Sequence, residues 1–250
     1  MSPFFPQLSW DPDTLLTAKI SASFAYALPK SLRKASFSLS ALRFWFIYHF
    51  LLAENANRMP LDILELQADK GQLLDFIRQA AERGYPEVSY RQWDTVVAAG
   101  DENFFSNRHY TAILGEQELD SRLQAEKYDV LILPCCPGGP EKVKTQLERL
   151  GRAVKPNGII IGLFNRQVVG SSSDSRSGFR FNLARSLSRG WQFHRMVDAM
   201  GYSVDFLTGG YFRRDHGLVP QEQVTRFRLK LLLGALFPTQ ADEIYWVLRK

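Results

Sequence analysis

The sequence predicts an α/β domain built on a doubly wound, mainly parallel β-sheet. Between residues 61 and 207, short apolar runs of strand length alternate with longer amphipathic segments, an order typical of helices crossing between parallel strands. Residues 130–133 are apolar without interruption, as expected of a strand buried on both faces. Glycine and proline separate the runs, and both residues favour turns.

The elements follow in chain order. Strands are expected over 61–66, 87–93, 110–114, 128–133, 159–164, 202–207 and 243–248. Helices are expected over 39–52, 72–83, 140–154, 191–200 and 221–236. Gly84 and Gly201 stand where a helix ends in the left-handed conformation. Turns are predicted at 134–140 and at 155–158, where Asn157 and Gly158 accept left-handed geometry. A polar loop is predicted at 170–178.

Composition indicates an ordinary globular protein in a reducing compartment. The 250 residues are 45% hydrophobic and 23% charged, enough for one large domain and a modest appendage. The net charge of +5 weakly favours an anionic partner. The only cysteines, Cys135 and Cys136, are adjacent, so a disulfide between them could not link distant parts of the chain. No Cys/His cluster has metal-binding spacing, so we expect a cytoplasmic protein without a metal.

The N-terminal part is expected to be an irregular arm and a helical cap over residues 1–58, followed by the α/β domain over 59–250. The first twenty residues lack the pattern of a secretory signal. The apolar window 39–53 is too short to span a bilayer and contains Arg43 and His49. The helix there is expected to close the domain; contact with a membrane surface is an alternative.

The first predicted strand leads into a helix through a short turn of altered composition. Such a strand-turn-helix presents backbone N–H groups and a helix N-terminus to a ligand. Gly71 precedes the helix, but the turn itself is Gln67-Ala68-Asp69-Lys70, where a cofactor-binding turn normally carries two more glycines. Glycine allows close backbone approach and positive φ, which Gln67 and Asp69 do not adopt freely.

Five stretches of the chain together resemble the class I S-adenosylmethionine-dependent methyltransferases, over roughly residues 40–250. Residues 63–74 are similar to that family's first motif, 115–119 to the turn before its fourth strand, and 128–133 to that strand. Residues 150–161 match a Leu-x-Arg-x-Leu-Lys-Pro-Gly-Gly pattern best, and 244–250 are similar to the last strand. The resemblance implies a Rossmann-like seven-stranded sheet whose last strand is antiparallel.

The resemblance also implies a cofactor, S-adenosylmethionine, and positions that would hold it. Glu65 stands at the acidic strand end, Asp94 near the acid for the ribose hydroxyls, and Glu116 near the adenine contact. The full set of implied cofactor positions is Glu65, Gln67, Asp69, Gly71, Asp94, Glu116 and Leu133.

Candidate substrate residues lie late in the chain, in a stretch of arginines and aromatics without an acid. Arginine binds carboxylate or phosphate in a fork, and aromatic rings stack on bases or sugars. His194 could accept a proton from an acceptor hydroxyl; a surface or capping role is the alternative. The substrate candidates are Arg180, Arg185, Trp191 and Arg195, which could equally form a solvated basic face.

Three functions remain open. The chain could methylate a small, sugar-linked or lipid-linked acceptor. It could be an inactive methyltransferase-fold subunit that pairs with an active partner, because Gln67 and Asp69 replace glycines. It could bind nucleic acid through its basic stretches. Residues 134–137 are not the Asn-Pro-Pro-aromatic motif of many amino-group methyltransferases, which argues against adenine or glutamine as the acceptor.

Overall fold

A computed structural model describes the central sheet and the helices that flank it. The described residues are 37–66, 72–82, 84–97, 111–114, 116–125, 127–137, 140–165, 193–210, 218–219, 234, 241 and 243–250. The helices are α3 (Leu39–Asn57), α4 (Gln72–Glu82), α5 (Glu116–Ala125), α6 (Pro140–Leu150) and the 3₁₀ turn η2 (Gly151–Ala153). Residues 193–199 are also helical. The strands are β1 (Phe37–Ser38), β2 (Leu61–Glu65), β3 (Tyr90–Val97), β4 (Thr111–Leu114), β5 (Tyr128–Pro137), β6 (Val154–Asn165), β7 (Ser203–Gly210), β8 (Leu218–Val219) and β9 (Glu243–Arg249).

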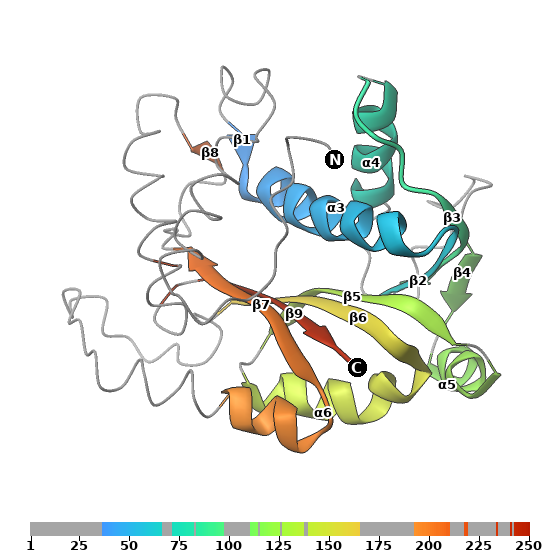
Figure 1. Cartoon of the computed structure of the whole chain (residues 1–250), viewed down its shortest axis with the longest axis vertical. Helices are drawn as coiled ribbons and strands as arrows, with labels where there is room; N and C mark the ends of the chain where they lie inside the picture. Colours follow the sequence, from blue (N-terminus) through green and yellow to red (C-terminus); the bar gives the residue numbers. More distant parts are fainter. Residues whose placement is uncertain are drawn as a thin grey trace.

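The predicted mixed α/β sheet is confirmed. The main sheet has the strand order β4-β3-β2-β5-β6-β9-β7 (Figure 1). β2 pairs in parallel with β3 and β5, and the same direction continues through β4 and β6. The last strand, β9, is antiparallel to both of its neighbours, β6 and β7. A separate antiparallel pair joins β1 to β8.

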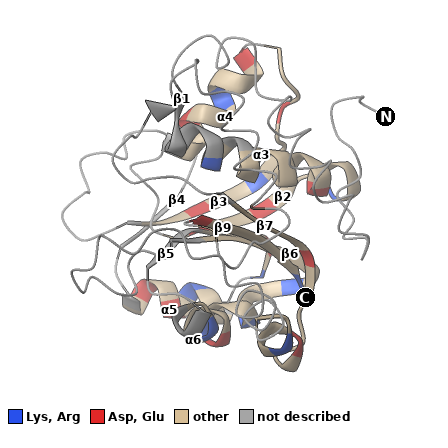
Figure 2. Cartoon of the chain, turned by 90° about the vertical axis from the view of Figure 1, so that its left-hand side faces the viewer, with Lys and Arg blue, Asp and Glu red and all other residues tan. Residues whose placement is uncertain are grey.

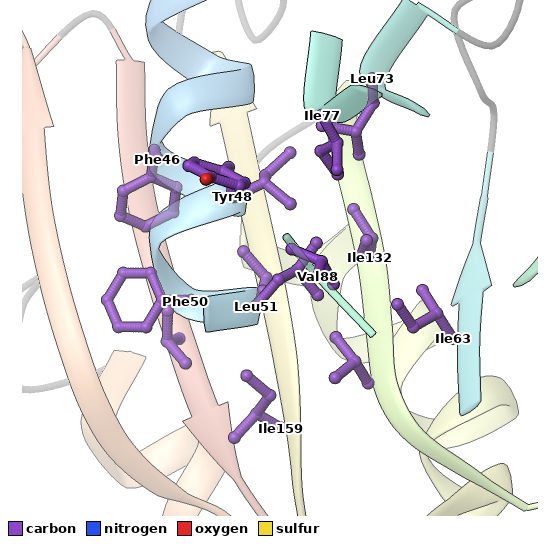
Figure 3. Packing of buried hydrophobic residues seen from close by; sticks show 14 of the residues in the cluster. Phe46, Tyr48, Phe50, Leu51, Ile63, Leu73, Ile77, Val88, Ile132 and Ile159 are labelled. Atoms are coloured by element: carbon purple, nitrogen blue, oxygen red, sulfur yellow. The ribbon is translucent and has the colours of Figure 1, made fainter. Parts of the chain in front are cut away.

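Helices cover both faces of this sheet. α3 and α4 lie on one face, and α5 and α6 lie on the other (Figure 1). The first layer buries Leu51 of α3 and Ile77 of α4 against Ile63 and Ile132 of the sheet (Figure 3). The second layer is a separate core, which includes α6 and residues 193–197. Of the helices that the structure describes, none combines the length and apolar character needed to cross a membrane.

Several strand boundaries differ from the sequence predictions, and the largest differences are extensions of β3, β5 and β6. β3 continues to Val97 through its pairing with β2 and β4, so Asp94 lies within the strand rather than at its end. β5 continues to Pro137, paired with Asn165, where a rigid turn was predicted. The predicted turn at 155–158 is an irregularity within β6, in which Asn157 adopts the expected left-handed φ of 60°.

Helix α3 lies along β9, held at each end by an ion pair of opposite polarity. Near its start, Arg43 binds both carboxylate oxygens of Glu243, the first residue of β9. Near its end, Glu54 accepts a 2.7 Å hydrogen bond from Arg249, the last residue of β9. Between them the Phe46 ring packs 5.1 Å from the Tyr245 ring. A reversed helix would place like charges together, so the pairs favour the observed direction.

A second charged network joins the amino ends of the central strands. Lys155 Nζ lies 2.7 Å from Asp62 Oδ2 and 2.8 Å from Asp129 Oδ2, and Arg91 also binds Asp62. Burial alone would raise the pKa of Asp62, but the hydrogen bonds from Arg91 and Lys155 outweigh it and lower that pKa. Basic residues beside the C-terminus lie at this same edge, where Arg249 bonds the carbonyl of Asn157 (Figure 2).

Replacing Arg43 by methionine tests the link between α3 and β9. Arg43→Met keeps a long side chain but leaves the buried carboxylate of Glu243 without its guanidinium partner. We expect the free energy of unfolding, measured with urea at neutral pH, to fall by about 3 kcal/mol. The matched control is Lys144→Met, because Lys144 forms an exposed pair with Glu148 at 3.9 Å. That control should lose less than about 0.5 kcal/mol; equal losses would contradict the account.

His49 makes stability depend on pH. Burial lowers the pKa of His49 from 6.5 to about 4, so between these values the unfolded chain binds the proton and the folded chain does not. Stability should therefore fall as pH drops from about 6.5 to about 4, by up to about 3 kcal/mol from this group. His49→Gln removes this contribution. Urea unfolding across that window should give a shallower pH profile for the variant, whereas parallel profiles would refute the assignment.

Candidate functional site

The order of strands in the sheet reverses between β2 and β5. From β2 the chain adds β3 and β4 on one side, and it then returns to add β5 and β6 on the other. In open α/β sheets, ligands bind outside the carboxyl ends of the strands at such a switch point. The candidate site is therefore the carboxyl edge of β2 and β5, where β2 ends at Glu65.

Glu65 is a buried carboxylate held at this edge by a neighbouring strand. The side chain is only 2% exposed, and its Oε2 accepts a 3.1 Å hydrogen bond from Trp93 Nε1. The backbone beyond it is also fixed, because the Leu66 N–H donates to the Ile132 carbonyl at 3.0 Å. The structure thus presents an oriented acidic group at the switch point.

Sequence reasoning missed Trp93 as a residue of this site. A buried indole N–H usually has a hydrogen-bond acceptor, so a tryptophan in a predicted buried strand could have been expected to bond a polar group nearby. The partner could not be identified, because it depends on the register between β2 and β3. Trp93 of β3 pairs with Ile63 of β2, and Glu65 lies two residues after Ile63. The side chains of Trp93 and Glu65 therefore lie on the same face of the sheet.

Asp94 lies on the opposite face of the sheet from Glu65. Asp94 is 0% exposed. Its Oδ2 accepts hydrogen bonds from Tyr128 Oη at 2.6 Å and from Gln92 Nε2 at 2.7 Å. Successive side chains of a strand alternate between faces, so Asp94 points away from the layer that contains Trp93. The structure does not bring Asp94 and Glu65 together, and the ribose-binding role of Asp94 gains no support from this geometry.

Two other implied cofactor positions border the same edge. Leu133 is 2% exposed and follows Ile132, the residue that pairs with Glu65. Its side chain belongs to the α5 and α6 layer. Glu116 is the first residue of α5, just after β4. Both positions lie at or beside carboxyl ends of strands, and their roles stay predictions.

His194 lies in a different part of the fold from Glu65. It belongs to the helical segment before β7, where its neighbour Phe193 packs with its ring 6.3 Å from Trp246 of β9. β5 and β6 separate β9 from β2. Burial lowers the pKa of His194, so the imidazole is neutral at neutral pH. Its role as a base stays a prediction, as does substrate binding by Arg195, which is exposed on the same segment.

The remaining candidates lie outside the described residues, so the structure does not place them. In the turn after β2 they are Gln67, Asp69 and Gly71, and in the late basic stretch they are Arg180, Arg185 and Trp191.

A substitution of Asp94 separates a structural role from a ligand role. In Asp94→Ala the buried Tyr128 hydroxyl and Gln92 amide lose this acceptor, so we expect unfolding free energy to fall by about 2 kcal/mol. Asp120→Ala is the control, because Asp120 makes an exposed pair with Arg149 and should cost less than about 1 kcal/mol. Unchanged stability in Asp94→Ala, measured by urea unfolding, would show that its hydrogen bonds do not support the fold.

Comparisons with known proteins give similar structures at low sequence identity. No protein-family model and no curated protein sequence matches the chain. A candidate SAM-dependent methyltransferase from Streptococcus mutans aligns with 84% of this chain at 11% identity and a TM-score of 0.47; the chain spans 49% of that protein.

Two further solved structures align over more of their own length. The plantazolicin methyltransferase BpumL, in complex with a pentazolic desmethylPZN analogue and SAH, has 15% identity and a TM-score of 0.47, with 96% of this chain and 97% of that one covered. The fibrillarin pre-rRNA processing protein of Methanococcus jannaschii has 14% identity and a TM-score of 0.41, with 77% and 69% covered. All three TM-scores lie below 0.5, so we base the functional argument on the site itself.

Proposed function

We propose that this protein binds S-adenosylmethionine outside the carboxyl ends of β2 and β5 and methylates a small acceptor. One observation carries the proposal: Glu65, a carboxylate that is 2% exposed, ends the strand at the switch point of the sheet. The resemblance of residues 63–74 to the first methyltransferase motif places an acid at that position. Topology and sequence therefore agree on the same residue.

The chemistry of Glu65 suits the proposed cofactor. A carboxylate accepts hydrogen bonds only, and both the ribose hydroxyls and the methionine ammonium of S-adenosylmethionine donate them. When bound, this cofactor supplies an electrophilic methyl group on a sulfonium centre. Asp94 is not included in the proposed cofactor contacts, because its carboxylate binds Tyr128 on the other face of the sheet.

A non-catalytic role is the second candidate, favoured by the turn sequence Gln67-Ala68-Asp69. The side chains there restrict the approach of a ligand to the backbone. A carboxylate at Asp69 would also repel a ligand carboxylate, and two like charges about 4 Å apart cost roughly 4 kcal/mol at an effective dielectric near 20. In this role the chain would keep the methyltransferase fold and assemble with an active partner protein.

The acceptor is proposed from the late basic stretch. Arg180, Arg185 and Arg195 with Trp191 suit an anionic, sugar-linked or lipid-linked molecule, and His194, neutral at neutral pH because burial lowers its pKa, could accept the acceptor's proton. Nucleic acid is the alternative anionic partner, and its affinity would fall steeply with salt. The cytoplasmic location stays a prediction from cysteine usage.

Ligand binding tests the proposal directly. S-adenosylmethionine or S-adenosylhomocysteine at about a hundred times its dissociation constant should stabilise the wild type by roughly 2.7 kcal/mol, seen as a higher melting temperature. Glu65→Ala should bind about ten to a hundred times more weakly in isothermal titration, because a hydrogen bond to a charged group is lost. Glu148→Ala, which changes an exposed glutamate of α6, should bind like the wild type.

The outcomes distinguish the two candidate functions. An absence of binding to the wild type with both ligands would refute the proposal. Binding together with transfer of a radiolabelled methyl group to a component of a cell extract, lost in Glu65→Ala, would support catalysis. Binding without transfer to any fraction would favour the non-catalytic role.

A further inference from the structure

The hydrogen bond between Trp93 and Glu65 joins two side chains that are both removed from water. Trp93 is 1% exposed and Glu65 is 2% exposed, and Trp93 Nε1 lies 3.1 Å from Glu65 Oε2. A buried carboxylate without such donors is costly. The indole therefore stabilises the acidic group at the switch point and selects which way it points.

The indole itself is held firmly by the strands around it. β3 lies between β2 and β4, so the backbone of Trp93 belongs to a strand that is paired on both sides. The Tyr90 ring packs edge-on against the Trp93 ring, with centroids 5.4 Å apart. The pairing of Trp93 with Ile63 of β2 fixes its backbone, and the Tyr90 ring restricts the movement of its indole, so the bond favours one orientation of the Glu65 carboxylate.

A second buried tryptophan, Trp246, lacks such a bond in the part of the chain that the structure describes. Trp246 is 0% exposed, yet its Nε1 has no hydrogen-bond partner among the described residues. Its ring fits against Gly162, where an added Cβ would lie 2.0 Å from a ring atom. Trp246 therefore provides a control of similar burial that lacks the bond made by Trp93.

We propose that Trp93 is a positioning residue for ligand binding, acting through Glu65. Its N–H holds the carboxylate in the orientation that accepts the donor groups of the adenosyl ligand, while the ring itself stays in the core. This inference rests on the proposed function, because it assigns to Trp93 a part in the same site. It also predicts that the effect of Trp93 on affinity disappears when Glu65 is absent.

Paired substitutions test this dependence. Trp93→Phe removes the donor, and Trp246→Phe removes an equally buried indole without that bond. We expect the dissociation constant for S-adenosylhomocysteine, from isothermal titration, to rise about tenfold in Trp93→Phe and to stay unchanged in Trp246→Phe. Adding Trp93→Phe to Glu65→Ala should cause no further loss of affinity. Urea unfolding of all variants separates affinity from stability.

An NMR measurement covers the case in which Trp93→Phe does not fold. In ¹⁵N-labelled wild type, the Trp93 indole N–H signal is identified by its Overhauser contact with the Tyr90 ring. Addition of S-adenosylhomocysteine should shift the Trp93 signal and leave that of Trp246 in place. A static Trp93 signal in protein that binds the ligand would overturn the inference.

The remaining outcomes are distinguishable. Wild-type affinity in Trp93→Phe, with weaker binding by Glu65→Ala, would overturn the role of Trp93 and leave the proposed function standing. Equal losses in Trp93→Phe and Trp246→Phe would show a general effect of core packing and would also overturn it. Failure of the wild type to bind the ligand would refute the proposed function first.

Discussion

Burial of acidic side chains is the constraint on which this structure depends. Six Asp and Glu residues are buried among the described residues, and each accepts a hydrogen bond or forms an ion pair. Such groups are costly in an apolar interior unless donors surround them. Because each acid except Glu65 and Asp94 also binds an Arg or Lys, and those two accept from Trp93 and Tyr128, every acid has a donor far away in sequence. The same bonds that satisfy the acids therefore also join distant elements.

Two kinds of donor bind the buried acids: charged Arg and Lys side chains, and neutral groups such as the indole of Trp93. Arg and Lys side chains hold Asp62 and Asp129 at the amino edge, and they tie both ends of α3 to β9. Trp93, by contrast, is a neutral donor to Glu65. Ion pairs therefore hold the amino ends of β2 and β5 and both ends of α3, whereas a neutral donor bonds the acid at the carboxyl end of β2.

The two edges of the sheet serve different purposes in this account. At the amino edge, charges from β2, β5 and β6 meet in one network around Lys155, which links consecutive strands. At the carboxyl edge, the ladder between β2 and β5 runs on past Glu65 to Leu66, so the acid sits on paired backbone. The Arg43 and Glu243 pair also lies at the carboxyl edge, but beside the ends of β6 and β7. The ends of β2 and β5 form the switch point, where ligands bind in open α/β sheets.

Local patterns in the sequence predicted much of the fold. The buried run at 61–66, the apolar face of α4 and the left-handed conformations of Gly84, Gly201 and Asn157 all follow from residues close in sequence, and each is present. The end of β3 could not be predicted, because pairing with β2 and β4 decides it. The environment of Asp94 depends on Tyr128, 34 residues away. The Arg43 and Glu243 pair spans 200 residues, beyond any local signal.

The central claim is that an adenosyl ligand binds where β2 and β5 end, and hydrogen exchange measured by mass spectrometry locates binding most directly. With S-adenosylhomocysteine present, we expect slower exchange in peptides that contain the end of β2 and the start of α4, and in those that contain the end of β5. The amino edge around Asp62 and Lys155 should exchange as in the free protein. Protection confined to that amino edge, or no protection at the ends of β2 and β5 under saturating ligand, would contradict the account.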